Sequence, residues 1–253
     1  MKNKLGMVVA SLSLLTMVST AVFGYALLSP TRRWFNADTP VRITVDSGGI
    51  ASINDSTRGV TAAVNALGNW NSGGVNVTSA SSGSASYRQG DGHSDILFSD
   101  PLRLCTGSCI AATLTGYYNT SQTGTCGGLN MVRVTDADVA FNLAFNYTTA
   151  AETAAEGGCS SEIYLESVIT HEVGHVIGLA HSSVSAALMA PTVAYCDNKP
   201  LNSDDYAGRN ALYNCTLVEG GGGGCTPAGQ TCTSNSQCCS LTCKGKPGLK
   251  TCR

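Results

Sequence analysis

Hydrophobic and polar positions along the first 219 residues alternate in patterns that predict several short strands and three amphipathic helices. Residues 41–45 alternate apolar with polar side chains, as a half-buried strand does. Between residues 60 and 67, apolar side chains recur at helical spacing behind the possible caps Asp55 and Ser56. Strands with few helices between them favour an α+β domain. Further strands are predicted at 75–77, 95–98, 129–134 and 138–141, and further helices at 163–176 and 204–213.

The two ends of the chain differ in composition from this central part. Lys2 and Lys4 precede an apolar stretch that continues to about Val22, which is typical of a secretory signal peptide over residues 1–26. An uncleaved membrane anchor is the alternative, but five Ser and Thr residues dilute the stretch. Five consecutive glycines near the other end predict a flexible linker. We therefore expect a secreted, extracellular protein with a main domain at 27–219, a linker at 220–224 and a small module at 225–253.

Charge is divided among these segments. Residues 1–33 carry four basic and no acidic side chains, residues 34–219 carry seven basic and seventeen acidic ones, and residues 225–253 again carry four basic and no acidic ones. A chain of 253 residues with 43% hydrophobic residues is not disordered as its main state. The acidic main domain argues against nucleic acid as a partner, because phosphate binding needs clustered Lys and Arg.

Twelve cysteines divide evenly, with six in the main domain and six in the C-terminal module. Even numbers in both parts predict disulfides formed in an oxidising compartment. In the main domain, two cysteines lie four residues apart, and two flank the last predicted helix. The expected pairs are therefore Cys105–Cys109, Cys196–Cys215 and, from the remaining two, Cys126–Cys159.

Three of the four histidines fall within the eleven residues from His171 to His181. On a helix, His171 and His175 project from the same face, close enough for both imidazoles to bind one metal ion. Gly178 can end that helix and return the chain, so that His181 becomes a third ligand. Three imidazoles on a tetrahedral zinc leave a fourth position for water, as in a catalytic site. Zinc lowers the pKa of such a water from 15.7 towards about 7.

The segment HEVGHVIGLAHS, followed by residues 187–191 (ALMAP), resembles the metzincin zinc endopeptidases and, within them, the matrixins. Ser182 directly after the third histidine and the eight-residue step from His181 to Met189 are the matrixin-like details. The resemblance extends over residues 165–213 and, in spacing only, from about Trp34 to Asn146. It implies a twisted mixed sheet with an active-site helix and a C-terminal helix.

The resemblance also implies roles for individual residues. It makes His171, His175 and His181 the zinc ligands, and Glu172 the general base that takes a proton from a zinc-activated water and delivers it to the leaving amine. Met189 would belong to the turn beneath the metal as a packing residue. The paired acids at 204–205 would help anchor that turn and the start of the chain. Calcium binding is possible, but no loop pattern points to a calcium site.

Three departures from the matrixin pattern limit the transfer. His93 is the only histidine outside the motif, so the second, structural zinc of animal matrixins cannot be built, and we expect His93 to be an ordinary loop histidine. No cysteine lies between the signal peptide and Val41 to act as a thiol latch. The Pro-x-Tyr wall of the pocket for the side chain after the scissile bond is replaced by a longer step from Pro191 to Tyr195. Substrate preference is therefore not transferable.

The cysteine spacing of the C-terminal module resembles the inhibitor cystine knot, or knottin. That resemblance implies the pairs Cys225–Cys239, Cys232–Cys243 and Cys238–Cys252; the sequence alone allows fifteen pairings. A zinc knuckle is the competing interpretation, but the module has no histidine. Two roles remain open for its lysines: docking on an anionic surface, or solubilising a stable cap. An inhibitory or toxin-like role is a third.

We therefore expect a secreted, monomeric zinc endopeptidase, with one catalytic Zn²⁺, that hydrolyses peptide bonds in extracellular proteins. The second hypothesis is a secreted binding or toxin-like protein whose knot carries the activity, with the metal domain as scaffold. The presence of Glu172 favours the enzyme, because a scaffold needs the ligands but not the base.

Overall fold

A mixed sheet organised around one long strand, β8 (Leu129–Phe141), forms the framework of the main domain. The computed structural model describes residues 24–88, 90–117, 122–219, 229–233, 243–246 and 250–252. Strands β3, β4, β5 and β8 are parallel to one another where they pair, and β6 lies antiparallel along the second half of β8. Along the sheet the order is β12 (Val218–Glu219), β7 (Thr123–Cys126), β8, β5 (Ser94–Leu97), β3 (Val41–Asp46) and β4 (Val77–Gly83), and β8 also pairs with β2 (Arg32–Arg33) and β6 (Ala111–Tyr117).

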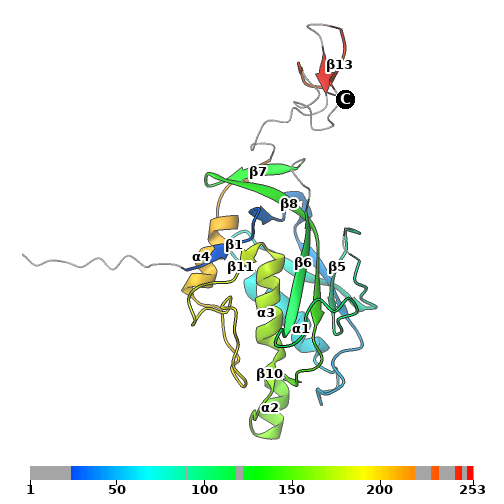
Figure 1. Cartoon of the computed structure of the whole chain (residues 1–253), viewed down its shortest axis with the longest axis vertical. Coiled ribbons are helices and arrows are strands. Elements are labelled where there is room, and N and C mark those ends of the chain that lie inside the picture. Colours follow the sequence, from blue (N-terminus) through cyan, green and yellow to red (C-terminus); the bar gives the residue numbers. More distant parts are fainter. Residues whose placement is uncertain are drawn as a thin grey trace, which may run out of the picture.

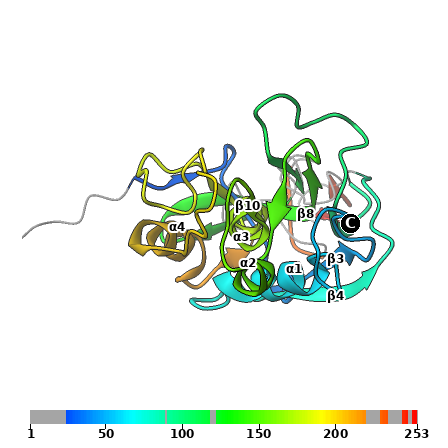
Figure 2. The ribbon, with the colours of Figure 1, turned by 90° about the horizontal axis from the view of Figure 1, so that it is seen from below.

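Helix α3 (Leu165–Val176) runs beside β6, and α1 (Val60–Ala66) packs against α3 (Figures 1 and 2). Trp70, in the short 3-10 helix Leu67–Trp70, is fully buried with Ile169 of α3 and Ile43 of β3 in one hydrophobic core. A further 3-10 turn spans Asn36–Asp38. The remaining helices are α2 (Ala150–Glu156) and α4 (Ser203–Tyr213), and short pairs join β1 (Ala26–Leu27) to β11 (Leu179–Ala180) and β9 (Tyr147–Thr148) to β10 (Ile163–Tyr164).

The predicted α+β class, with a mixed sheet, a helix that contains His171 and His175, and a helix over residues 203–213, is confirmed for the main domain, with corrections to individual elements. The two strands predicted at 129–134 and 138–141 are one strand, because Asp136 and Asp138 are buried and accept backbone amides from Gly90 and Asp95. The strand predicted at 75–77 begins only at Val77 and continues through a serine-rich run.

Other elements were missed or begin at a different residue. Helix α1 has Gly59, at φ +81°, as its N-cap in place of Asp55 or Ser56, and the Asp55 carboxylate accepts the Gly59 amide in the preceding turn. Helix α3 begins at Leu165 because the two residues before it form β10. Strands β6 and β7 and helix α2 were not predicted from the sequence.

Two of the three disulfides predicted for the main domain are wrong. Cys105–Cys109 is confirmed, but Cys126 pairs with Cys215 and Cys159 pairs with Cys196. Cys196 and Cys215 lie beyond opposite ends of α4, whose eleven residues span about 16 Å, far more than the 4.4–6.8 Å between Cα atoms that a disulfide allows. Helix α4 therefore holds Cys196 and Cys215 too far apart to form a disulfide.

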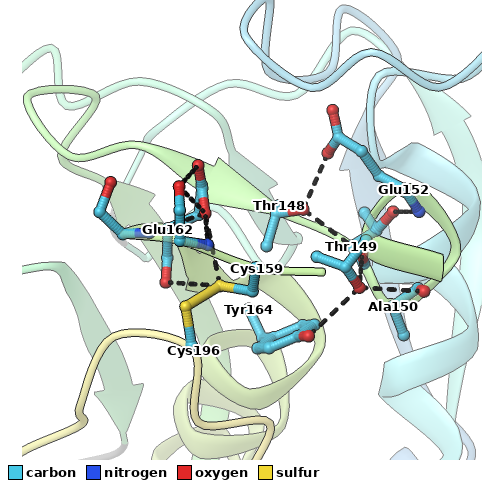
Figure 3. The surroundings of a disulfide bond; sticks show 11 residues. Thr148, Thr149, Ala150, Glu152, Cys159, Glu162, Tyr164 and Cys196 are labelled. Atoms are coloured by element: carbon cyan, nitrogen blue, oxygen red, sulfur yellow. Dashed lines mark hydrogen bonds between the residues drawn. A yellow bond between two sulfur atoms is a disulfide. The ribbon is translucent and has the colours of Figure 1, made fainter. Parts of the chain in front are cut away.

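The Cys159–Cys196 disulfide joins the loop after α2 to the segment that follows the active-site histidines (Figure 3). The amide of Cys196 donates to the Glu162 carbonyl at 2.9 Å, and the Glu162 carboxylate accepts the amides of Ser160 and Ser161. This connection holds the segment after the histidines against the loop that leads into β10 and α3.

The two ends of the chain are described only in part. Residues 1–23 of the predicted signal peptide and the predicted linker at 220–224 lie outside the described residues, whereas residues 24–26 belong to the fold. In the C-terminal module, Cys232 pairs with Cys243, as the knottin resemblance implied. The strands β13 (Cys243–Lys244) and β14 (Thr251–Cys252) pair antiparallel. Cys225, Cys238 and Cys239 lie outside the described residues. Among the described helices, none is both long and apolar enough to span a membrane.

Candidate active site

Helix α3 presents His171 and His175 on one face, one turn apart, as the four-residue spacing predicted. The opposite side of the helix packs on the core through Ile169 and Val173, which are fully buried. Gly174 lets this helix approach the following segment closely, because a Cβ atom there would lie only 2.2 Å from the Met189 sulfur. Met189 therefore packs directly beneath the histidines, as the matrixin resemblance implied.

Gly178 turns the chain sharply after α3 and returns it to the metal-binding face. Its φ of +107° is a conformation that side chains with a Cβ rarely adopt, and a Cβ there would lie 2.1 Å from the carbonyl oxygen of Arg32. The next two residues form β11, which pairs with β1. His181 follows directly and faces the two helical histidines.

The three histidines converge with their ring nitrogens within 4.8 Å of one another. The Nδ1 atoms of His171 and His175 lie 2.7 and 2.8 Å from the carbonyl oxygens of Leu188 and Leu179. A carbonyl only accepts hydrogen bonds, so both Nδ1 atoms carry the proton and both Nε2 atoms keep a free lone pair. The Nε2 atoms of His175 and His181 lie 3.3 Å apart. This neutral imidazole set, oriented by backbone carbonyls, fits Zn²⁺.

Burial keeps these rings neutral at ordinary pH. It lowers the pKa of His171 and of His175 to about 4, and it also lowers the pKa of His181. Desolvation is the largest cause in each case, and the Lys199 charge lowers the pKa of His171 further. Neutral imidazole is the form that binds a metal ion.

Two adjacent carboxylates at the start of α4 anchor the turn that carries Met189. Asp205 is almost fully buried and accepts the amides of Leu188 and Met189 at 2.9 and 3.0 Å, and that of Asn202 at 2.8 Å. Asp204 accepts the Ser182 hydroxyl at 2.6 Å. It also accepts the amides of residues 24 and 25 at the start of the described chain. The anchoring roles implied for the paired acids are thereby found in the geometry.

Glu172 lies beside the histidines with its carboxylate buried. Its side chain is 5% exposed, and its Oε2 atom accepts a 2.5 Å hydrogen bond from the Thr113 hydroxyl of β6. Burial raises the pKa of Glu172, and the Thr113 hydrogen bond opposes that rise. Sequence reasoning missed Thr113. The alternation of Ile110, Ala112 and Leu114 with polar or small residues was the signal that marks this strand.

A cleft of about 790 Å³ opens beside the three histidines and Glu172. One wall is β6, which among the described strands pairs with β8 alone. The other wall is formed by α3, Leu188 and residues 190–193, and Lys199 also lines the cleft. Tyr195, which replaces the tyrosine of the Pro-x-Tyr pattern, is 58% exposed and does not line the cleft, whereas Val193 does. His93 is exposed and lies outside the cleft.

Known proteins are similar to this chain in the segment that contains the three histidines. Residues 119–214 match the family model described as matrixin. A segment of 65 residues is 46% identical to Metalloendoproteinase 5-MMP of Arabidopsis thaliana, and it covers 25% of this chain and 18% of that protein. A segment of 58 residues is 45% identical to Matrix metalloproteinase-9 of Canis lupus familiaris, covering 22% of this chain and 8% of that protein.

A third relative extends the comparison to a human protein. Matrix metalloproteinase-19 of Homo sapiens is 48% identical over 52 residues, which are 20% of this chain and 10% of that protein. The chain thus spans less than a fifth of the length of these curated relatives. The sequence around the three histidines, the methionine turn and α4 is therefore similar to the matrixins, and the structure gives this segment the arrangement that the similarity implies.

Proposed function

We propose that this chain is a secreted zinc endopeptidase that hydrolyses peptide bonds in extracellular proteins. The observation that carries the proposal is the buried Glu172 beside three neutral imidazoles whose lone pairs converge. A metal-binding scaffold needs the imidazoles but has no use for a carboxylate held at the same point. The matrixin match over residues 119–214 supports the same reaction class.

The residues of the site divide the work of peptide hydrolysis. His171, His175 and His181 would hold Zn²⁺, which supplies a Lewis acid and lowers the pKa of water towards neutrality. Glu172 takes a proton from the attacking water and delivers it to the leaving amine. Burial raises the pKa of this carboxyl towards the pH at which it must both accept and release a proton. Thr113 holds the carboxylate in position.

Strand β6 offers the substrate a backbone edge. It pairs with β8 on one side, and its other side lines the cleft. An extended peptide can add to such an edge through main-chain hydrogen bonds, while alternate side chains enter pockets. Antiparallel addition to β6 would carry the scissile bond past Thr113 and therefore past Glu172.

Export and tail docking complete the proposal. Three disulfides in the main domain support an oxidising compartment, which agrees with the signal-like start of the chain. We propose that the basic C-terminal module docks on an anionic surface and thereby raises the local concentration of the protease near its substrate. Lys244 is exposed in the described part of this module, in line with that role.

The decisive experiment compares the purified protein with Glu172→Gln in cleavage of a diverse peptide library, with zinc content measured on both. We expect Glu172→Gln to bind zinc and to lose about 10²–10⁴-fold in kcat/KM, because a positioned general base contributes that much. Glu156→Gln, an exposed change on α2, serves as the matched control and should leave cleavage unchanged.

The same library is offered to the chain without residues 220–253. Retained cleavage supports the enzyme, whereas lost cleavage from a folded, zinc-loaded domain supports the binding or toxin-like alternative. Equal cleavage by the wild type and Glu172→Gln would overturn the role of the carboxylate. A zinc-loaded wild type that cuts no peptide would overturn the function.

A further inference from the structure

The charged side chains that line the cleft are mostly basic, whereas those of the whole domain are mostly acidic. Between residues 24 and 219 the chain has nine Lys and Arg side chains and seventeen Asp and Glu side chains. Among the described residues that line the cleft, the basic side chains are Arg32 and Lys199, and the only carboxylate is Glu172. The lining of the cleft therefore carries more basic than acidic side chains, whereas the domain around it is acidic.

The two cations differ in how many of their donors are engaged. The Arg32 guanidinium donates to Ser29, Pro30 and Thr115, and it stacks on the Tyr117 ring. Lys199 donates to one carbonyl, that of Ser185, at 3.1 Å, and no carboxylate lies within ion-pair distance of it in the described part of the chain. An ammonium has three N–H donors, so Lys199 keeps donors for a ligand.

The geometry of β6 and α3 decides which part of a peptide meets Lys199. Ala111, at the start of β6, lies opposite Phe141 at the end of β8, and β9 and β10 follow at this end and lead into α3. Ser167, in the first turn of α3, therefore lies towards the start of β6, and its hydroxyl is within 3.3 Å of the Lys199 carbonyl oxygen.

A peptide that adds antiparallel to β6 runs from the Tyr117 end towards the Ala111 end. Residues before the scissile bond then pass Arg32, which contacts Thr115, and residues after it pass Ser167 and Lys199. Lys199 thus faces the carboxyl-terminal side of the bond that is cut.

The lining of the cleft is mixed. Val168, Leu188 and Val193 line it together with the small side chain of Ser167. The Ser167 hydroxyl donates a hydrogen bond to the side-chain oxygen of Asn198 at 3.0 Å. Aliphatic side chains and an ammonium group in one lining match a substrate side chain that has methylene groups and a terminal carboxylate.

We propose that Lys199 selects an acidic side chain, glutamate above all, at the residue immediately after the scissile bond. This inference rests on the proposed endopeptidase function and adds a substrate class to it. The Glu carboxylate accepts a hydrogen bond from the Lys199 ammonium while its methylene groups contact Val193 and Leu188. A hydrogen bond to a charged group inside a partly buried pocket is worth about tenfold or more in discrimination.

The test is a matched set of peptides that differ only at the residue after the cleaved bond, carrying Glu, Gln, Leu or Lys. We expect the wild type to cleave the Glu peptide with a kcat/KM about tenfold higher than the Gln peptide. Lys199→Met keeps the aliphatic length without the charge and should favour Leu over Glu. Lys199→Glu should reverse the preference towards Lys. Arg42→Glu makes the same charge change at an exposed position on β3, outside the cleft, and should leave the preference as in the wild type.

Binding of the same peptides to Glu172→Gln and to the double variant Glu172→Gln/Lys199→Glu, followed by fluorescence anisotropy, gives a readout that needs no turnover. The proposal is supported if Glu172→Gln binds the Glu peptide more tightly than the Gln peptide and the double variant shows no such difference. Equal treatment of Glu and Gln by the wild type, or a Glu preference that survives Lys199→Glu, overturns it. If the wild type cleaves no peptide but still binds Glu over Gln through Lys199, the endopeptidase function fails while the pocket assignment stands.

Discussion

The wall of the cleft formed by α3 and residues 181–205, here called the helix wall, is held by carboxylates that accept backbone amides. Asp205 alone fixes three amides, and Asp204 joins Ser182 to the start of the chain. The opposite wall, β6, here called the strand wall, is partly exposed and offers an open backbone edge. A side-chain hydrogen bond from Thr113 to Glu172 joins the two walls.

The two walls differ in how strongly their function depends on the identity of their side chains. The helix wall needs specific side chains, because a histidine, a carboxylate or a glycine without a Cβ performs a task that few other residues can. The strand wall acts mainly through its backbone, which every residue supplies. The comparison predicts that substitutions in the helix wall affect folding and catalysis together, whereas those in the strand wall change catalysis with little effect on stability.

The largest effect is expected from Asp205→Ala. It leaves three buried amides without an acceptor, and we expect the free energy of unfolding to fall by about 3–5 kcal/mol. Urea denaturation followed by tryptophan fluorescence measures this change. Glu156→Ala, an exposed change in α2, is the control and should shift stability by less than about 0.5 kcal/mol. Similar small changes in both variants would show that the carboxylate does not hold the helix wall.

Asp138, on β8 beneath the strand wall, tests the opposite case of a buried carboxylate that weakens the fold. Burial, and more weakly the Asp95 and Asp136 charges, raise its pKa from an ordinary value of 3.8 to about 7. The folded state therefore favours the protonated form, and this contribution is present below about pH 4 and lost as the pH rises through about 7.

We expect the free energy of unfolding of the wild type to fall by about 1–3 kcal/mol more than that of Asp138→Asn between pH 4 and pH 8. Denaturation curves at both pH values, with Glu156→Gln as a reference, give the difference. Parallel pH dependences of the wild type and Asp138→Asn would show that Asp138 titrates as an ordinary exposed carboxyl.

The smallest effect is expected from Thr113→Val, which preserves the shape of the side chain and removes its hydroxyl. Loss of the hydrogen bond to Glu172 should lower kcat/KM about three- to tenfold while zinc content and stability stay close to those of the wild type. Thr113→Ser keeps the hydroxyl and should retain most of the activity. A stability loss as large as that of Asp205→Ala would remove the distinction between the two walls.

The sequence predicted the functional residues of the helix wall but not those of the strand wall. The positions of His171, His175, His181 and Glu172 were predicted because ligand spacing on a helix is a local property. The role of Gly178 was predicted for the same reason. Strand β6 and Thr113 were missed, because the strand contacts α3 through tertiary packing and its apolar alternation is short.

The wrong disulfides have a related cause. Closeness in the sequence suggested partners for Cys196 and Cys215, but the rigid length of α4 separates them, and each pairs with a cysteine from a distant segment. The strands predicted at 129–134 and 138–141 left a gap that the structure closes, because Asp136 and Asp138 accept backbone amides from a loop and a neighbouring strand. Long-range contacts decided each of these cases.

The Cys159–Cys196 disulfide has a consequence for how this molecule can diversify. One end of the segment from Met189 to Cys196 is fixed by Asp205 through backbone amides, and the other end is fixed by a covalent bond. Neither attachment involves the side chains of residues 190–195. Ala190 is buried and Val193 packs against the core, whereas positions 191, 192, 194 and 195 are exposed. Directed evolution can therefore randomise these four positions between two permanent attachment points without redesigning the protein around them.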